Sequence, residues 1–230
     1  MSKIIIALDF NDSAKALKLA QKVRHNLEWV KVGLELFIAS GPAIVISLKE
    51  MGFKVFLDLK LLDIPNTVSG AVSSCIEIGA DMLTLHTLGG EEMIKAAINT
   101  RDIKDSKSRK TSLVGVTLLT SVDENDIVWQ DKRTTGEITS DLAQKACKWG
   151  LDGCVCSGLE ASVIKKITGR HFKLVTPGIR PEPSADDQKR VVTPQQARQA
   201  GSDFLVIGRP VTASSDPARA LDNIRRLLGA

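Results

Sequence analysis

Hydrophobic positions along the chain fall into short continuous runs that alternate with stretches of amphipathic spacing. Such continuous runs are typical of strands buried on both faces of a parallel sheet. Eight strands are expected, at Ile4–Leu8, Trp29–Gly33, Val55–Leu59, Met82–His86, Leu113–Leu118, Gly153–Cys156, Lys173–Thr176 and Phe204–Gly208. Between the strands, apolar residues recur at spacings of three and four, which predicts helices, most clearly over Asp12–Val23, Thr134–Trp149 and Asp216–Leu228.

This alternation favours an α/β fold that closes into a barrel. Eight strand–helix units in a chain of 230 residues match a single (β/α)₈ TIM barrel, whose active site lies at the C-terminal ends of the strands. A doubly wound open sheet is the alternative, because eight units do not require closure. Without a linker or a low-complexity tract, residues 1–230 are expected to form one domain. The long connections Ser121–Arg133 and Gly178–Lys189 are expected to act as lids.

Composition narrows the class of protein. The chain has 43% hydrophobic and 25% charged residues, and no apolar run approaches the roughly 20 residues of a membrane span. The N-terminal segment is typical of a first strand rather than of a secretory signal, so a cytoplasmic location without membrane partners is expected. Cys154 and Cys156 are expected to be core thiols, with metal binding as the alternative.

Charge and aromatic content bear on the partner. The net charge of +4 is mild and the basic residues are dispersed, which suits a small anionic substrate. Nucleic acid is not expected, because there is no basic tract and aromatic residues make up only 4% of the chain.

The stretch from Asp58 to Thr67, DLKLLDIPNT, carries the densest chemistry of the chain. The preceding FKVFL is expected to be a buried strand, so Asp58 and Lys60 point to the same side at its carboxyl end. Pro65 suits the first turn of a helix. Opposite charges at such a place are costly to desolvate unless they serve each other or a ligand. A structural salt bridge is enough to explain an isolated D-x-K pattern. The whole ten-residue string is far more specific than that pattern.

Other candidate site residues lie within or just after the carboxyl ends of several predicted strands. They are Asp9, Lys31, His86, Thr120, Ser121, Pro177, Arg180, Gly208 and Arg209. Each has an ordinary structural explanation: Asp9 suits a helix cap, and His86 suits a satisfied interior histidine, so we leave His86 out of the chemistry. Several charged residues converging on one rim nevertheless favour an active site.

The last two strands predict a phosphate site. Gly208 lets the backbone approach a ligand closely, and the guanidinium of Arg209 matches phosphate oxygens. In (β/α)₈ enzymes, the loops after these strands frequently bind phosphate. Gln188, in the second long loop, is expected to fold over the phosphate. A glycine turn beside a solvated arginine is the alternative.

The string DLKLLDIPNT closely resembles the signature of the orotidine 5′-monophosphate decarboxylase family. Further matches follow in order along nearly the whole chain, at Ala7–Asp9, Lys31–Gly33, Leu119–Ser121, Val175–Arg180, Asp187–Lys189 and Val206–Pro210. The resemblance implies cofactor-independent, metal-free decarboxylation of orotidine 5′-monophosphate to uridine 5′-monophosphate and CO₂, the last step of de novo UMP biosynthesis. It also implies a homodimer with shared active sites.

The resemblance assigns roles to individual residues. The implied catalytic network alternates in charge beneath C6 of the pyrimidine and consists of Lys31, Asp58, Lys60 and Asp63 of the partner subunit. The implied substrate-binding residues are Asp9 and Lys31 at the ribose hydroxyls, Thr67 at the ribose of the neighbouring site, Ser121 at the pyrimidine edge, Gln188, Gly208 and Arg209 at the 5′-phosphate, and Ile64, Thr120, Pro177 and Arg180 around the pocket.

The chain departs from the family pattern at three places. The segment 181–187 lacks the glycines usual before the phosphate-binding glutamine, which bears on lid closure. Leu62 replaces a common histidine, and Thr87-Leu88 replaces a smaller pair. None of these positions has an assigned role.

The residue types suit the implied reaction. Loss of CO₂ from C6 leaves a carbanion that the ring delocalises poorly, and a lysine held between carboxylates can offset that charge and protonate C6. Three other activities share features of this pattern: a magnesium-dependent sugar-phosphate decarboxylase, a phosphosugar isomerase or epimerase, and a silent nucleotide-binding barrel. The segments Ile64–Thr67 and Pro177–Arg180 favour the nucleotide enzyme.

Overall fold

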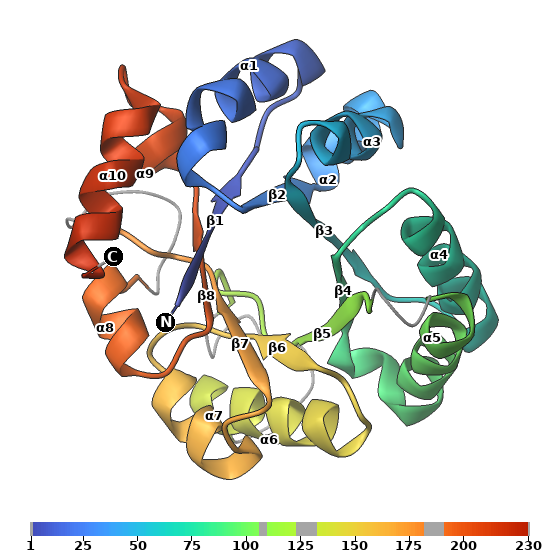
Figure 1. Cartoon of the computed structure of the whole chain (residues 1–230). Coiled ribbons are helices and arrows are strands. Elements are labelled where there is room, and N and C mark those ends of the chain that lie inside the picture. Colours follow the sequence, from blue (N-terminus) through green and yellow to red (C-terminus); the bar gives the residue numbers. More distant parts are fainter. Residues whose placement is uncertain (1, 106–109, 123–132, 182–190, 230) are drawn as a thin grey trace.

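Eight parallel strands pair in chain order, and the last pairs with the first, so the sheet closes on itself (Figure 1). This computed structural model describes residues 2–105, 110–122, 133–181 and 191–229. The strands are β1 (Lys3–Ala7), β2 (Trp29–Gly33), β3 (Lys54–Leu61), β4 (Met82–His86), β5 (Ser112–Val116), β6 (Gly153–Val155), β7 (Lys173–Thr176) and β8 (Phe204–Ile207). The closed (β/α)₈ barrel confirms the predicted fold, and the open sheet is wrong.

Helices surround the strands as an outer ring (Figure 1). Within the described residues they are α1 (Ser13–Val23), α2 (Leu34–Ser40), α3 (Ala43–Glu50), α4 (Pro65–Glu77), α5 (Gly90–Lys104), α6 (Thr135–Lys148), α7 (Ala161–Thr168), α8 (Pro194–Gln199), α9 (Arg209–Thr212) and α10 (Pro217–Leu227), with the 3₁₀ turns η1 (Arg24–Asn26) and η2 (Thr87–Gly89). The side chains of Asp12, Thr134 and Asp216 cap α1, α6 and α10, which explains why the predicted helices begin there. None of the described helices is long and apolar enough to cross a membrane.

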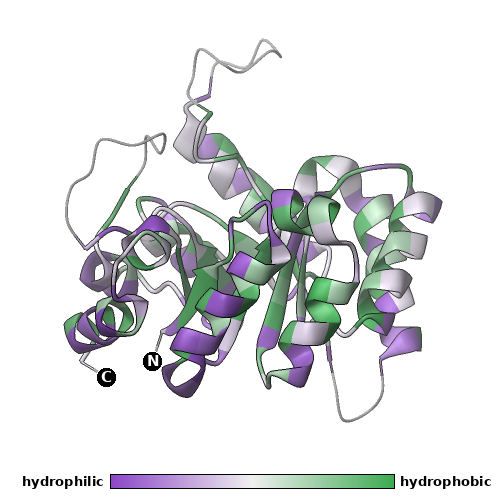
Figure 2. Ribbon diagram, turned by 90° about the horizontal axis from the view of Figure 1, so that it is seen from above, coloured by the Kyte–Doolittle hydropathy of each residue, from purple (hydrophilic) through white to green (hydrophobic). Residues whose placement is uncertain are grey.

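Alternating side chains of the strands build two cores. In β1, Ile6 packs outward against the helices, whereas Ile5 and Ala7 point into the barrel. The inner cluster also includes Phe56 and Val206. Apolar residues therefore concentrate on the strands and on the inner sides of the helices, while polar residues lie outside (Figure 2). The upper layer of the inner cluster becomes the floor of the site described below.

Two strand ends differ from the prediction by two residues, whereas the other strand boundaries differ by at most one. β3 continues to Leu61, beyond the predicted end at Leu59, because a register shift lets the strand resume pairing with β4. β5 ends at Val116, before the predicted Leu118. The next residue, Thr117, donates its side-chain hydroxyl to the carbonyl of Val155 at 2.9 Å.

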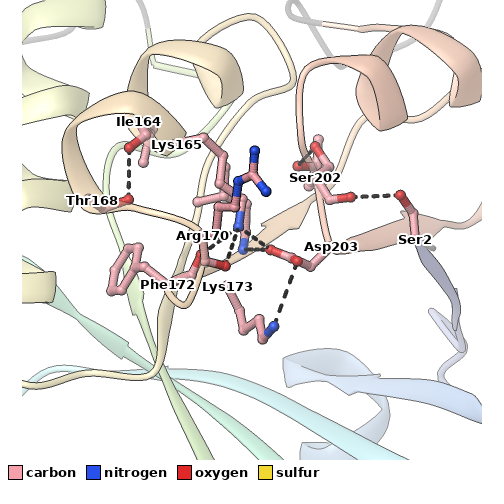
Figure 3. A network of polar contacts seen from close by, with 11 residues as sticks. Ser2, Ile164, Lys165, Thr168, Arg170, Phe172, Lys173, Ser202 and Asp203 are labelled. Carbon is pink, nitrogen blue, oxygen red and sulfur yellow. Dashed lines mark hydrogen bonds and ion pairs between the residues drawn. The ribbon is translucent and has the colours of Figure 1, made fainter.

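Ion pairs are built into the amino ends of the strands. Asp203, directly before β8, accepts the backbone N–H of Leu174 in β7 at 2.8 Å and Nζ of Lys165 from α7 at 2.7 Å (Figure 3). Lys165 also donates to the carbonyl of Phe172 at 2.7 Å. One carboxylate thus joins a helix to two neighbouring strands.

Candidate functional site

A cavity of about 450 Å³ lies at the carboxyl ends of the barrel strands. Its floor includes Phe56, Val175 and Val206 from the inner core. Nine of the predicted site residues line it: Asp9, Lys31, Asp58, Lys60, Thr120, Pro177, Arg180, Gly208 and Arg209. A volume of this size, with an apolar floor and a few convergent polar groups, is typical of small-molecule sites.

Four of the lining charges form an alternating chain across β1, β2 and β3. Nζ of Lys31 lies 2.8 Å from Oδ1 of Asp9 and 3.8 Å from Oδ2 of Asp58. Nζ of Lys60 lies 2.9 Å from that same Asp58 oxygen. The side chains of Lys31 and Asp58 are each 11% exposed and that of Lys60 is 29% exposed. Each charge withdrawn from water therefore has an opposite charge beside it, as a buried ion requires.

The backbone of β3 departs from regular strand geometry where these residues lie. The ladder with β4 shifts register between Leu57 and Leu61, so residues 58–60 lie opposite Thr84 alone. Lys60 has φ of 52°, and it is the one non-glycine residue of the described chain with positive φ. Such left-handed conformations are uncommon outside glycine, and bulges of this kind redirect side chains near active sites.

Two arginines line the cavity after the ends of β7 and β8. Arg180 is buried, and its Nη1 donates to a backbone carbonyl at 3.0 Å. Arg209 is the first residue of α9, directly after Gly208. Among the described lining residues, four side chains are basic and two are acidic. This excess of positive charge suits an anionic ligand.

Some predicted site residues do not line the cavity. Asp63, Ile64 and Thr67 are exposed along the connection from β3 into the first turn of α4. Oδ1 of Asp63 accepts the backbone N–H of Ile64 at 2.7 Å. Ser121 is exposed beside the cavity without lining it. Gln188 lies outside the described residues.

Sequence analysis missed Thr84. Its Oγ1 donates to Oδ1 of Asp58 at 3.0 Å and accepts the backbone N–H of Lys60 at 2.8 Å. The available signal was strand alternation: Thr84 lies two residues after Met82, an inner-core residue, and is therefore a polar side chain facing the barrel interior.

The apolar wall was also missed. Inward-facing and loop residues near the ends of β5 and β6 supply it, namely Val116, Leu118, Leu119, Val155 and Cys156. Cys154 and Cys156 are buried and unbridged, as predicted for core thiols. In the described parts of the chain, no group of three or more His, Cys, Asp or Glu side chains could hold a metal ion.

His86 ends β4 near this network. Burial lowers the pKa of its imidazole below the ordinary value, and the positive charge of Lys60 lowers it further, while Asp58 acts in the opposite direction. Within the described residues, its Nδ1 is buried without a hydrogen-bond partner. We therefore expect a neutral imidazole at pH 7.

Comparison with known proteins extends over nearly the whole chain. The sequence model of the orotidine 5′-phosphate decarboxylase / HUMPS family matches residues 2–224. A protein of Maridesulfovibrio salexigens named orotidine 5′-phosphate decarboxylase is 53% identical over 224 residues, covering 97% of each chain. A protein of the same name from Nitratidesulfovibrio vulgaris (strain DP4) is 47% identical, covering 96% of this chain and 94% of its own.

A solved structure agrees with these sequence matches. The crystal structure of orotidine 5′-phosphate decarboxylase from Lactobacillus acidophilus superposes with a TM-score of 0.89 at 34% identity, covering 100% of both chains.

Proposed function

Because the chain belongs to the orotidine 5′-phosphate decarboxylase / HUMPS family, we propose that it converts orotidine 5′-monophosphate to uridine 5′-monophosphate and CO₂ without a cofactor. The observation that carries the mechanism is the Asp58 carboxylate held between two lysine ammonium groups at the cavity floor. The protein is thus a decarboxylase of pyrimidine biosynthesis. Its four free cysteines agree with a reducing compartment such as the cytoplasm.

Lys60 is the proposed proton donor. When the bond from C6 to the substrate carboxyl group breaks, CO₂ leaves and the electron pair stays on C6. The Lys60 ammonium offsets this charge and transfers a proton to C6, and the resulting amine recovers a proton from water. The ion pair of Lys60 with Asp58 holds the ammonium in place beforehand, so little reorganisation is needed during the reaction.

The remaining lining residues are proposed to hold the nucleotide. Asp9 and Lys31, joined at 2.8 Å, offer an acceptor and a donor to the ribose hydroxyls. Gly208 and Arg209 offer a close backbone approach and a guanidinium for the 5′-phosphate. Thr120, Pro177 and Arg180 would enclose the pocket, with Ser121 at the pyrimidine edge and Gln188 over the phosphate. Because the phosphate lies far from C6, its binding energy can contribute to the chemical step by ordering the site.

The alternative within the superfamily is a magnesium-dependent sugar-phosphate decarboxylase. The two relatives described above, at 47% and 53% identity, both carry the name of the nucleotide enzyme. The absorbance change of orotidine 5′-monophosphate, followed with and without EDTA, tests the proposal directly. Chelator-insensitive formation of uridine 5′-monophosphate supports it. Failure of a folded protein to convert the nucleotide, with turnover of sugar phosphates in magnesium, would replace it.

We also propose that the working form is a homodimer in which each subunit completes the site of the other. In the single chain, Asp63, Ile64 and Thr67 lie exposed outside the cavity, in a segment that also exposes Leu62. An exposed acid beside exposed aliphatic side chains suits a surface that a second copy covers. Asp63 of the partner subunit would then extend the alternating network beyond Lys60.

Complementation tests the shared site. Lys60→Ala and Asp63→Ala are each expected to be nearly inactive alone. When the two variants are mixed and allowed to exchange subunits, one site of each mixed dimer regains both native residues, so activity should return. Absence of recovery, with subunit exchange demonstrated, would show that Asp63 serves its own chain. Full activity of Asp63→Ala alone would show that Asp63 is not needed.

A further inference from the structure

The bulge in β3 faces a single residue of β4. Residues 58–60 lie opposite Thr84 alone, because the ladder between the strands shifts register from Leu57 to Leu61. A backbone N–H within such a shift loses its place in the regular ladder. The N–H of Lys60 is instead satisfied by the hydroxyl of Thr84, at 2.8 Å.

The same hydroxyl reaches the carboxylate that holds the lysine side chain. A threonine hydroxyl has one proton, so accepting from the Lys60 amide leaves its O–H directed at Oδ1 of Asp58, 3.0 Å away. Oδ2 of Asp58 then remains for the ammonium of Lys60 at 2.9 Å. Thr84 therefore contacts the backbone of Lys60 directly. It acts on the side chain of Lys60 indirectly, through Asp58.

Two observations show why this hold matters at Lys60. Its φ of 52° is a conformation that a lysine adopts at an energetic cost, so surrounding contacts must maintain it. Its side chain is also the more exposed member of its ion pair, at 29% against 11% for Asp58. Without a fixed backbone and a fixed carboxylate, the ammonium would be free to swing within the cavity.

We infer that Thr84 is a positioning residue for the decarboxylation, one that fixes the Asp58 carboxylate and the Lys60 backbone so that the Lys60 ammonium stays directed at the reacting carbon. This inference rests on the proposed function. Thr84 is fully buried and faces the barrel interior beside apolar residues such as Met82. Packing alone is satisfied by valine, whereas the two hydrogen bonds require the hydroxyl.

A pair of near-isosteric variants separates packing from hydrogen bonding. Thr84→Val keeps the shape and removes the hydroxyl, whereas Thr84→Ser keeps the hydroxyl. We expect Thr84→Val to lower kcat by about 10- to 100-fold, as for a displaced catalytic group, with little change in the Kd for uridine 5′-monophosphate. Thr84→Ser should retain most of the wild-type kcat.

Thr176→Val is the matched control. Thr176 is equally buried, and its hydroxyl bonds Ser202 at 2.7 Å, away from the alternating charges. This control is expected to lose stability and keep kcat. Wild-type kcat in Thr84→Val, equal impairment of Thr84→Ser and Thr84→Val, or the same fall in kcat in Thr176→Val would each overturn the inference. If Thr84→Val does not fold, Thr84→Ala is compared with Thr84→Ser by the same criteria.

Hydrogen exchange gives a second measurement that does not depend on turnover. Exchange of the Lys60 amide should accelerate in Thr84→Val and remain slow in Thr84→Ser, because the hydroxyl protects that N–H. An unchanged exchange rate of the Lys60 amide in Thr84→Val would show that Thr84 does not fix the Lys60 backbone. If the wild type fails to convert orotidine 5′-monophosphate, the proposed function fails instead, and the exchange result still decides whether Thr84 fixes Lys60.

Discussion

Aspartates pair with basic side chains at both ends of the barrel, but with different surroundings. At the amino ends, an aspartate directly precedes each of β4, β6 and β8. Each of these aspartates accepts a backbone N–H from the preceding strand in the sequence, namely β3, β5 or β7. Each also pairs with a basic side chain on the helix that leads into that preceding strand. The three sets are Asp81 with Val55 and Lys49, Asp152 with Leu113 and Arg101, and Asp203 with Leu174 and Lys165. Their distances all lie between 2.6 and 2.8 Å.

At the carboxyl ends, the corresponding groups face a cavity. Asp58 is held by Thr84 and Lys60, and Lys31 lies farther away at 3.8 Å. No strand N–H among the described hydrogen bonds is donated to this carboxylate. Its Oδ1 accepts the hydroxyl of Thr84, and its Oδ2 faces Lys31 and Lys60, which line the cavity. The same residue types therefore join strands to helices at one end and line a cavity at the other. This division agrees with barrel enzymes generally, where the carboxyl face carries the chemistry and the amino face carries stability.

The largest expected effect comes from replacing one lysine at each end of the barrel with alanine and comparing the two variants. Lys60→Ala should lower kcat by on the order of 10⁴-fold or more, because it removes the proposed proton donor and with it the charge proposed to lie beside C6. Binding of uridine 5′-monophosphate should persist. Lys165→Ala removes the cation paired with Asp203 and should lower stability while leaving kcat near the wild-type value (Figure 3).

Steady-state kinetics and urea unfolding on both lysine variants check this expectation. Normal turnover by Lys60→Ala would remove Lys60 from the mechanism. A comparable fall in kcat for folded Lys165→Ala would show that the two ends are not separate in function.

The second effect tests the amino end alone. Arg101 is only 3% exposed and its Nη1 lies 2.6 Å from Asp152, which also accepts the N–H of Leu113. Asp152→Ala should lower the free energy of unfolding by roughly 3 kcal/mol, because it leaves a buried cation and a strand N–H without this partner. Urea denaturation measures the loss, and kcat per folded molecule should not change. A loss below about 1 kcal/mol would place this pair with ordinary surface ion pairs.

The fold was predictable because hydrophobic patterning alone places eight strands within a few residues of those observed. The site was predictable where a charged residue lies near the carboxyl end of a strand, because parallel strands bring these ends together. Lys31 and Asp58 lie within such strands, and Asp9 follows one. Strand lengths were less predictable, since the register shift in β3 depends on pairing with β4 rather than on local sequence.

Thr84 illustrates what strand-end reasoning overlooks. It lies in the middle of β4, and its role depends on a bulge in the neighbouring strand. The amino-end aspartates were overlooked for a related reason. Their partners are 26 to 51 residues away in sequence, so neither spacing nor periodicity connects them. The proposed roles of Asp63 and Thr67 depend on a second copy of the chain, which no pattern within one chain can place.

The third effect sharpens the description of the carboxyl end as a site for anions. Arg209→Ala should weaken binding of uridine 5′-monophosphate by about 10- to 100-fold, the value of a charge-assisted hydrogen bond. Uridine, which lacks the phosphate, should bind almost equally well to both proteins. Titration calorimetry with both ligands provides the test, and Arg226→Ala on α10, which does not line the cavity, is the matched control. Equal losses for the two ligands would count against a phosphate role for Arg209.

The smallest expected effect concerns the pH dependence of stability near the network. Burial, and then the charge of Lys60, lower the pKa of His86 in the folded protein. In the unfolded chain, the imidazole takes up a proton near its ordinary pKa of about 6.5. Between that pH and the lower folded pKa, the unfolded state binds more protons, so stability falls as the pH decreases through this range.

His86→Gln should therefore lose less stability than the wild type between pH 7.5 and pH 5.5, and kcat at pH 7.5 should change little because His86 has no proposed catalytic role. Urea unfolding at the two pH values measures the difference, with His25→Gln in the exposed turn η1 as the control. An unchanged pH dependence in His86→Gln would show that the imidazole is not held neutral. A large fall in kcat would instead add His86 to the network that faces the cavity. The carboxyl end of the barrel would then combine its charged side chains with a neutral base, which the amino end lacks among the sets described above.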